Sequence, residues 1–201
     1  MNSLHSTSSP RSSIHFFLAA ALVLCGLSAS VWAEVPKSLL PAFGKEGAEF
    51  TTKAQSGNVV KGWLPTDWKD NTEWAAVSAT YTKLDDAPDK AAGAVRIKVE
   101  KADEGQLQLT SYQGIQKYKK GTRYLVTGWV RSADGTAVKL GVRQKTEPYE
   151  FYHEQELTGG AEWKRFEFAF TPATDIEAFL MFVVTAAGTV DLAGVAVEEK
   201  P

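Results

Sequence analysis

The chain has 201 residues, a formal net charge of −2 and one cysteine, and 44% of its residues are hydrophobic and 23% charged. This composition is that of an ordinary globular domain and excludes a disordered, collagen-like or disulfide-stapled chain. The 22 basic and 24 acidic residues create no cationic field that would attract a phosphate backbone, so we expect no nucleic-acid binding.

The first 33 residues carry the pattern of a secretory signal peptide. Polar residues and Arg11 precede an apolar run at 16–27, and Val31 and Ala33 suit the −3 and −1 positions of a cleavage site. The run is shorter than the ~20 residues of a membrane-spanning helix. We therefore predict a secreted or periplasmic protein, cleaved near Ala33 and free of the membrane. Lipidation at Cys25 is an alternative, disfavoured by the bulky Leu24 before it.

Removal of residues 1–33 leaves a chain with a restricted chemistry. Residues 34–201 contain no cysteine and one histidine, His153. Thiol nucleophiles, disulfides, iron–sulfur clusters and histidine-rich metal centres are therefore excluded. We expect His153 to be structural, because the sequence alone places no serine and aspartate around it as a catalytic triad would need.

Residues 49–201 are predicted to form one all-β domain after a short lead-in at 34–48. Apolar and polar residues alternate at 95–100, 106–110, 124–131, 138–142 and 166–170, the period of a half-buried strand. Residues 179–184 form a continuous apolar strand, and 190–197 form the last one. Turn signals separate these segments, and no amphipathic helix interrupts them. The pattern indicates an antiparallel β-sandwich of the jelly-roll type.

An ordered set of short landmarks resembles carbohydrate-binding modules of families 4, 9 and 22. The landmarks are residues 62–65 (Gly-Trp-Leu-Pro) followed by Trp68 and Trp74, then 93–97, 121–124, 128–132, 162–166 and 188–191. The resemblance spans about residues 45–199. It implies a galactose-binding-domain-like jelly roll that binds a plant or algal glycan in a groove on one concave sheet. Such modules accompany glycoside hydrolases, so the implied protein is a non-catalytic, monomeric glycan binder that works beside a separate hydrolase.

Alternation also predicts which polar and aromatic side chains leave the core. If Tyr124, Val126 and Val130 face inward, Trp129 and Arg131 face outward from the same strand. The same parity turns five further residues outward: Gln106, Gln108, Thr110, Tyr112 and Arg143. An aromatic ring packs on the flat face of a pyranose, and guanidinium and amide groups bond its hydroxyls. These residue types therefore suit a sugar.

Tyr152 and Glu154 lie two residues apart and project from one face of a strand. The family 22 branch uses a Tyr-x-Glu pair to stack on and bond its ligand, and the resemblance implies that role here. The alternative is an ordinary strand tyrosine beside a solvated charge. The predicted ligand-binding residues, expected to converge on one trough, are Trp129, Tyr112 and Tyr152 for stacking and Arg131, Arg143, Gln108 and Glu154 for hydroxyls.

Other aromatic residues are expected to be structural. Trp63, Trp68 and Trp74 cluster near the first strand and suit core or loop-anchor positions, and Trp163 stands beside a ladder of phenylalanines at 166–170. For Trp129 and Arg131, an alternative to ligand binding is a packing pair on a convex face.

We predict no cofactor and no metal site. Related modules often hold a structural Ca²⁺ through carboxylates near both chain ends, with an acidic pair before the last strand. Only one carboxylate, Asp191, stands at that place here. A partial oxygen shell from Asp191 with Glu46 or Glu49 keeps calcium open as an alternative.

Two other classes of protein remain open. A small secreted glycoside hydrolase or lyase could use Glu154 with a second carboxylate. A structural or adhesive β-sandwich could use its outward aromatic side chains to bind a protein partner.

Overall fold

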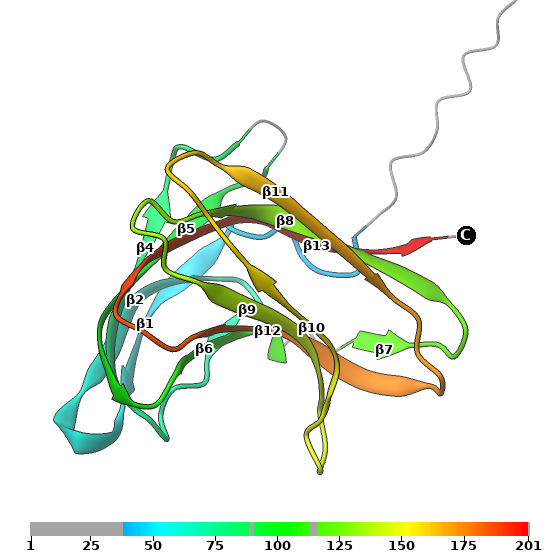
Figure 1. Cartoon of the computed structure of the whole chain (residues 1–201), viewed down its shortest axis with the longest axis horizontal. Helices are drawn as coiled ribbons and strands as arrows, with labels where there is room; N and C mark the ends of the chain where they lie inside the picture. The colour runs from blue at the N-terminus through cyan, green and yellow to red at the C-terminus, as the bar shows by residue number, and fades with distance from the viewer. Residues whose placement is uncertain (1–37, 89–90, 113–115, 201) are drawn as a thin grey trace, which may run out of the picture. The chain divides into compact units, whose positions relative to one another are not determined.

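The structure is a computed structural model that describes residues 38–88, 91–112 and 116–200. The predicted signal peptide at 1–33 lies outside the described residues. The regular secondary structure of the described chain is β-strand apart from one 3₁₀ turn, η1 at Gln55–Gly57 (Figure 1). The strands are β1 (Gly47–Lys53), β2 (Val59–Pro65), β3 (Lys69–Asp70), β4 (Ala76–Leu84), β5 (Ala94–Glu104), β6 (Leu107–Thr110), β7 (Gln116–Tyr118), β8 (Arg123–Arg131), β9 (Val138–Gln144), β10 (Phe151–Leu157), β11 (Lys164–Phe170), β12 (Ile176–Val184) and β13 (Gly188–Lys200).

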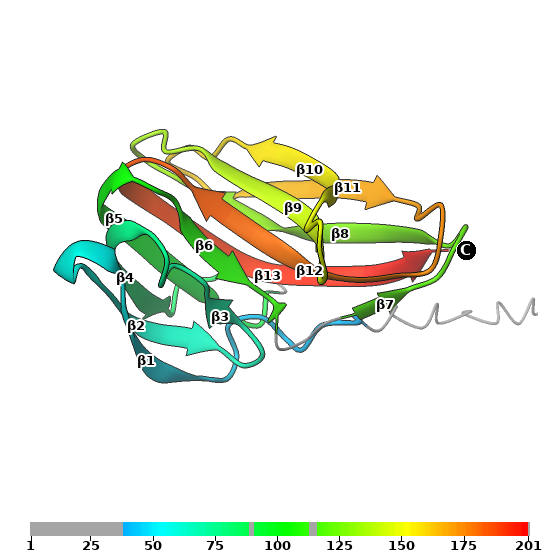
Figure 2. The ribbon, with the colours of Figure 1, turned by 90° about the horizontal axis from the view of Figure 1, so that it is seen from below.

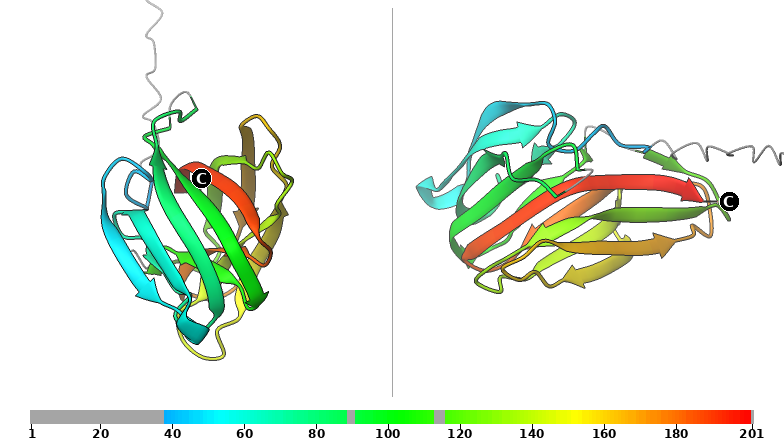
Figure 3. Two further views of the ribbon diagram at one scale, coloured as in Figure 1. Left: turned by 90° about the vertical axis from the view of Figure 1, so that its left-hand side faces the viewer. Right: turned by 90° about the horizontal axis from the view of Figure 1, so that it is seen from above.

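These strands form two sheets that pack face to face. The seven-stranded sheet has the order β1-β2-β4-β5-β13-β8-β11 and is seen from outside in the right panel of Figure 3. The six-stranded sheet has the order β10-β9-β12-β6-β3, with β7 paired to β12, and is seen in Figure 2. Among the described pairings only β2 with β4 is parallel. The antiparallel jelly-roll sandwich predicted from the sequence is confirmed.

The predicted inward residues fill the space between the sheets. The alternating apolar positions of β5, β6, β8, β9 and β11 all belong to one buried core, which includes Ile97, Leu109, Val126, Leu140 and Phe168. Their polar neighbours consequently point to the outer faces of the two sheets.

The lead-in predicted at 34–48 also contributes to this core. Leu40 and Phe43 are buried, and the Phe43 ring meets Trp68 edge-on at 4.9 Å. The Leu39 N–H donates to the Val197 carbonyl oxygen at 2.7 Å, which ties the segment to the last strand. The burial of Trp68 agrees with the core position expected for it.

Two strands lack the alternation of a half-buried strand, for opposite physical reasons. β1 is an edge strand with no fully buried residue, so it lacks the alternation that marks a half-buried strand. β12 shows the opposite extreme, because its inward residues Leu180 and Phe182 join the main core, while Phe179, Met181 and Val183 form a second buried cluster. Burial on both faces explains its continuous apolar sequence. No helix in the described part of the chain has the length and hydropathy to cross a membrane.

Candidate functional site

A groove of about 620 Å³ lies on the outer face of the six-stranded sheet. Its volume is within the range of small-molecule binding sites. The residues that line it come from strands β9, β12, β6 and β3 and from the loops next to them, and Figure 2 shows these four strands side by side. Its lining residues are Lys69, Asn71, Trp74, Gln106, Gln108, Thr110, Tyr112, Arg143, Lys145, Tyr149 and Phe179.

Residues that point outward from alternating strands form the floor of the groove. Gln108 and Thr110 alternate with the core residues Leu107 and Leu109 on β6, and Arg143 follows the core residue Val142 on β9. Phe179 of β12 lies between them, because β12 pairs with both β9 and β6. Phe179 therefore gives the groove an apolar base. Phe179 belongs to the outer cluster with Met181 and Val183, and Phe151 of β10 packs against that cluster.

Exposed aromatic side chains border the groove. Trp74, Tyr112 and Tyr149 are 47%, 43% and 45% exposed, and they are three of the four exposed aromatic residues in the described chain. The Tyr112 ring meets Phe179 edge-on at 5.3 Å. Exposed rings gathered at one concave site are available for stacking on a ligand.

Arg143 supports one of these rings. Its Nε donates to the Tyr149 carbonyl oxygen at 3.2 Å, and its guanidinium lies 5.3 Å from the Tyr149 ring centroid. Tyr149 has a φ of 59° and donates its N–H to the Thr146 carbonyl oxygen at 2.9 Å, so a tight turn raises the ring at the rim. The remaining guanidinium N–H groups are donors for a ligand.

Amide groups add donors and acceptors on the other side of the groove. The Asn71 Nδ2 donates to the Gln108 Oε1 at 2.7 Å, which orients both side chains. Gln108 lines the groove but is only 3% exposed, and within the described chain its Nε2 has no hydrogen-bond partner.

A buried polar network holds the loop that carries Asn71 and Trp74. Asp70 accepts hydrogen bonds from the Thr72 hydroxyl at 2.6 Å, the Thr72 N–H at 3.2 Å and the Tyr81 hydroxyl at 3.4 Å. The Thr72 hydroxyl in turn accepts the Gln108 N–H at 3.2 Å. Burial raises the pKa of the Asp70 carboxyl, against the opposing effect of these hydrogen bonds. The loop is thus tied to β6 next to the groove.

Three of the seven predicted ligand-binding residues meet in this groove. Gln108, Tyr112 and Arg143 come from β6, the segment after it and β9. Gln106 and Thr110, which parity also turned outward, join them in the lining.

Tyr152 and Glu154 lie on the edge strand β10 and are not among the lining residues. Glu154 forms an ion pair of 3.2 Å with Lys139. A register shift between Phe151 and His153 changes the parity of this strand. Phe151 consequently packs on the outer cluster, whereas His153 stacks on the core residue Phe168 at 4.6 Å.

Trp129 and Arg131 do not lie with the other predicted residues. Both face outward as predicted, but β8 belongs to the seven-stranded sheet, so they lie away from the groove. The trough expected from all seven residues does not form, because alternation along a strand does not reveal which sheet the strand joins.

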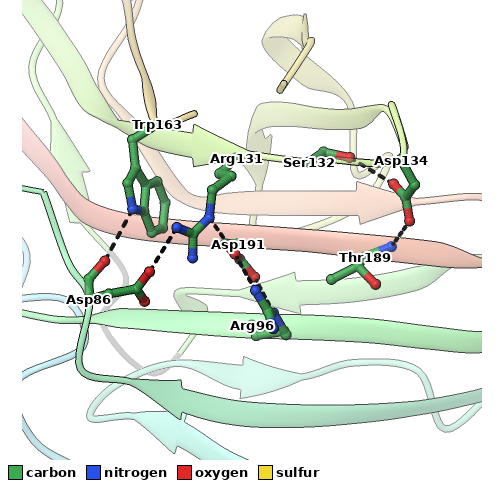
Figure 4. A network of polar contacts seen from close by, with 8 residues as sticks. All are labelled: Asp86, Arg96, Arg131, Ser132, Asp134, Trp163, Thr189 and Asp191. Carbon is green, nitrogen blue, oxygen red and sulfur yellow. Dashed lines mark hydrogen bonds and ion pairs between the residues drawn. The ribbon is translucent and has the colours of Figure 1, made fainter. Parts of the chain in front are cut away.

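Arg131 instead belongs to a charged network on the seven-stranded sheet (Figure 4). Asp191 of β13 lies between Arg96 of β5 and Arg131 of β8, which contact its carboxylate at 2.8 and 2.7 Å. Arg131 also pairs with Asp86 at 2.7 Å and lies 4.4 Å from the Trp163 ring centroid. Hydrogen bonding from Arg131 lowers the pKa of Asp86.

This network bears on the calcium alternative. The carboxylate of Asp191 is 3% exposed and is engaged by two guanidinium groups, so it does not fit the role of a calcium ligand. The described residues contain no cluster of three or more histidine, cysteine or acidic side chains that could hold a metal ion.

Several groove residues were not identified from the sequence. Trp74 was expected to anchor a loop or the core, but its ring is exposed at the groove. Lys69, Asn71, Lys145, Tyr149 and Phe179 were also not assigned to the site. For Tyr149, the sequence signal is its position within the aromatic and acidic stretch 149–154.

The sequence profile of the carbohydrate binding domain of families 4 and 9 matches residues 56–189, more than half of the chain. The chain therefore belongs to this family. A search of curated proteins gave no match.

Solved structures show a related fold. The chain is similar to a CBM4 module, with a TM-score of 0.56, 16% identity and coverage of 81% of this chain and 100% of that one. It is also similar to the enzymatically active domain of tailspike protein 4 from bacteriophage CBA120, with a TM-score of 0.52, 13% identity and coverage of 67% of this chain and 20% of that one. The xylan-binding domain CBM22-1 of Paenibacillus barcinonensis Xyn10C matches with a TM-score of 0.49, 10% identity and coverage of 83% and 97%.

Proposed function

We propose that the protein is a secreted, non-catalytic module that binds a polysaccharide or oligosaccharide in the groove on the six-stranded sheet. The observation that carries this proposal is the gathering of three exposed aromatic residues, Trp74, Tyr112 and Tyr149, around amide and guanidinium donors. Membership of a carbohydrate binding domain family supports the same conclusion.

The groove offers both kinds of contact that a sugar needs. The rings of Trp74, Tyr112 and Tyr149 can pack on pyranose faces, and each stacked ring contributes about 1 kcal/mol beyond area burial. The free amide of Gln108 and the unused donors of Arg143 can bond ring hydroxyls. Two or three such rings with a few hydrogen bonds correspond to a Kd of about 10–100 μM.

The lining supports a binding role over hydrolysis. Glycoside hydrolysis normally uses two carboxyl groups that flank the scissile bond. The lining residues in the described chain include no aspartate or glutamate. Glu154, the carboxylate considered from the sequence, is paired with Lys139 outside the groove.

Secretion rests on the N-terminal sequence. A polar start, an apolar run at 16–27 and small or aliphatic residues at Val31 and Ala33 are the features of a cleaved signal. N-terminal sequencing of the exported protein should begin at Glu34. Recovery of the intact N-terminus from the culture medium or periplasm would contradict cleavage.

Affinity electrophoresis against a glycan panel tests the binding function. The wild type should be retarded by at least one glycan, and the W74A/Y112A double variant should lose most of that retardation. W129A is the matched control, because Trp129 lies on the other sheet. Equal retardation of the wild type and the W74A/Y112A variant, or no retardation by any glycan, would contradict the proposal. A reducing-sugar assay on the same panel should detect no product, whereas product release would indicate a hydrolase.

A further inference from the structure

The charged residues of the groove are all of one sign. Lys69, Arg143 and Lys145 line it, and no acidic residue appears in the lining within the described chain. The whole chain has a net charge of −2, so this cationic site contrasts with the protein around it. A local excess of one charge in a groove attracts ligands of the opposite charge.

Little of this positive charge is neutralised inside the protein. Within the described residues, the Arg143 guanidinium contacts only the Tyr149 carbonyl oxygen, the Met181 sulfur at 3.7 Å and two aromatic rings. Lys69 forms no ion pair within the same ranges. Lys145 is 3.5 Å from Glu177, a carboxylate that also contacts Lys117 at 3.5 Å. Among the residues that the structure describes, two groove cations therefore lack an acidic partner, and the third shares one.

The cations stand on both sides of the groove. Lys69 belongs to β3 at one edge of the sheet, whereas Arg143 belongs to β9 and Lys145 follows it. β12 and β6 lie between these two strands (Figure 2). A chain of acidic sugars that crosses the sheet would meet positive charge at each side and stacking rings between.

We propose that the groove takes an acidic polysaccharide, whose sugar units carry carboxylate or sulfate groups. This inference rests on the proposed glycan-binding function and specifies its ligand class. The planar guanidinium of Arg143 retains unused N–H donors for an anionic oxygen, and Lys69 and Lys145 act as point charges. The rings of Trp74, Tyr112 and Tyr149 take the sugar faces.

Isothermal titration calorimetry with a matched set of glycans tests the proposal. The probes are polygalacturonate, the same polymer after carboxyl reduction, carrageenan, xylan and mixed-linkage β-glucan. The wild type should bind polygalacturonate or carrageenan at least about tenfold more tightly than the neutral polymers. The affinity should fall several-fold as NaCl is raised from about 50 mM to about 500 mM, because salt screens charge attraction between exposed groups.

Two lysine-pair variants distinguish charge attraction by the groove from non-specific attraction by the rest of the protein surface. K69Q/K145Q removes two groove charges and should weaken binding of the acidic polymer about tenfold. K53Q/K98Q removes the same charge from exposed positions on the seven-stranded sheet and should have little effect. Circular dichroism and thermal melts establish that both variants are folded.

The results test two proposals separately: glycan binding in general, and specificity for an acidic glycan. Binding of polygalacturonate that carboxyl reduction abolishes assigns the carboxylate, and binding of carrageenan alone assigns the sulfate ester; either supports an acidic ligand. Equal, salt-insensitive binding of neutral and acidic glycans overturns the acidic specificity but leaves glycan binding intact. Equal weakening by K53Q/K98Q and K69Q/K145Q also overturns a groove-specific charge effect. No binding of any glycan overturns the proposed function itself.

Discussion

The Arg143 guanidinium holds both the backbone and the ring of Tyr149, with its Nε 3.2 Å from the Tyr149 carbonyl oxygen and its centre 5.3 Å from the ring centroid. The arginine stands on β9, whereas Tyr149 stands in the loop beyond it with a φ of 59°. A residue on a strand thus holds an exposed ring at the groove. Because the ring is already held in place, the loop loses less conformational freedom when a ligand binds.

Arg143→Lys tests this positioning. Lysine keeps the charge but lacks the planar fork that bonds the carbonyl and lies against the ring. Affinity for the bound glycan should fall about fivefold, measured by calorimetry. The melting temperature should change by no more than ~2 °C, because the residue is not in the core. Undiminished affinity would show that Arg143 does not organise the groove.

Trp74 and Trp68 should separate binding from stability. Trp74 is 47% exposed at the groove, so W74A should weaken binding about tenfold and change the free energy of unfolding by less than ~1 kcal/mol. Trp68 is 4% exposed and packs on Phe43, so W68A should cost about 3–5 kcal/mol. Urea unfolding and calorimetry on both variants check this. Strong destabilisation by W74A would contradict its assignment to the ligand surface.

Asp191 should stabilise the seven-stranded sheet without affecting the groove. Asp191→Asn removes the charge that two arginines share, and it should lower the free energy of unfolding by about 1–3 kcal/mol. The control D86N acts on a carboxylate that is 61% exposed and should cost less than ~1 kcal/mol. Glycan affinity should be unchanged in both variants. A weaker effect of D191N than of D86N in urea unfolding would contradict the central role of Asp191.

The contacts of Asp191 with the two arginines predict that calcium does not change the stability of the protein. Because Asp191 is engaged by Arg96 and Arg131, a chelator such as EDTA should leave the melting temperature of the wild type unchanged. Thermal unfolding monitored by circular dichroism with EDTA and with added Ca²⁺ measures this. A clear rise in melting temperature with Ca²⁺ would show that a cation site exists elsewhere in the protein.

Asp134 should contribute to the acid sensitivity of the fold. Hydrogen bonds from the hydroxyl and N–H of Thr136, the Ser132 hydroxyl and the Thr189 N–H lower its pKa from 3.8 to about 2. Figure 4 shows the contacts of Asp134 with Ser132 and Thr189. A pKa that is lower in the folded state stabilises the fold above the unfolded value and ceases to do so as the pH falls toward about 2. Asp134→Asn should therefore reduce the loss of unfolding free energy between pH ~4 and ~2 in urea titrations. An identical pH profile for the variant would contradict this assignment.

The physics of strands explains which site residues could be predicted. Gln108, Tyr112 and Arg143 were found because each adjoins or occupies a strand with clear alternation. The same rule turned Trp129 and Arg131 outward correctly but could not place them, because strand order depends on long-range pairing between β8 and β13. A local period specifies a face of a strand, not the sheet to which it belongs.

The remaining groove residues lie where the sequence shows no apolar and polar alternation, or near a register shift that interrupts it. Trp74 and Tyr149 belong to segments outside the strands, where no alternation indicates direction. The register shift near Tyr152 exchanges the faces of neighbouring residues, so Phe151 reaches the outer cluster. Such a bulge has no simple sequence signature.

Tryptophan indole N–H signals in an NMR titration with a bound oligosaccharide test the location of the site most directly. The described chain contains five tryptophans, Trp63, Trp68, Trp74, Trp129 and Trp163. The Trp74 indole should show the largest shift on ligand addition, while the Trp129 and Trp163 indoles on the seven-stranded sheet should remain in place. Large shifts of Trp129 and Trp163 with an unmoved Trp74 would place the ligand on the opposite sheet and contradict the groove assignment.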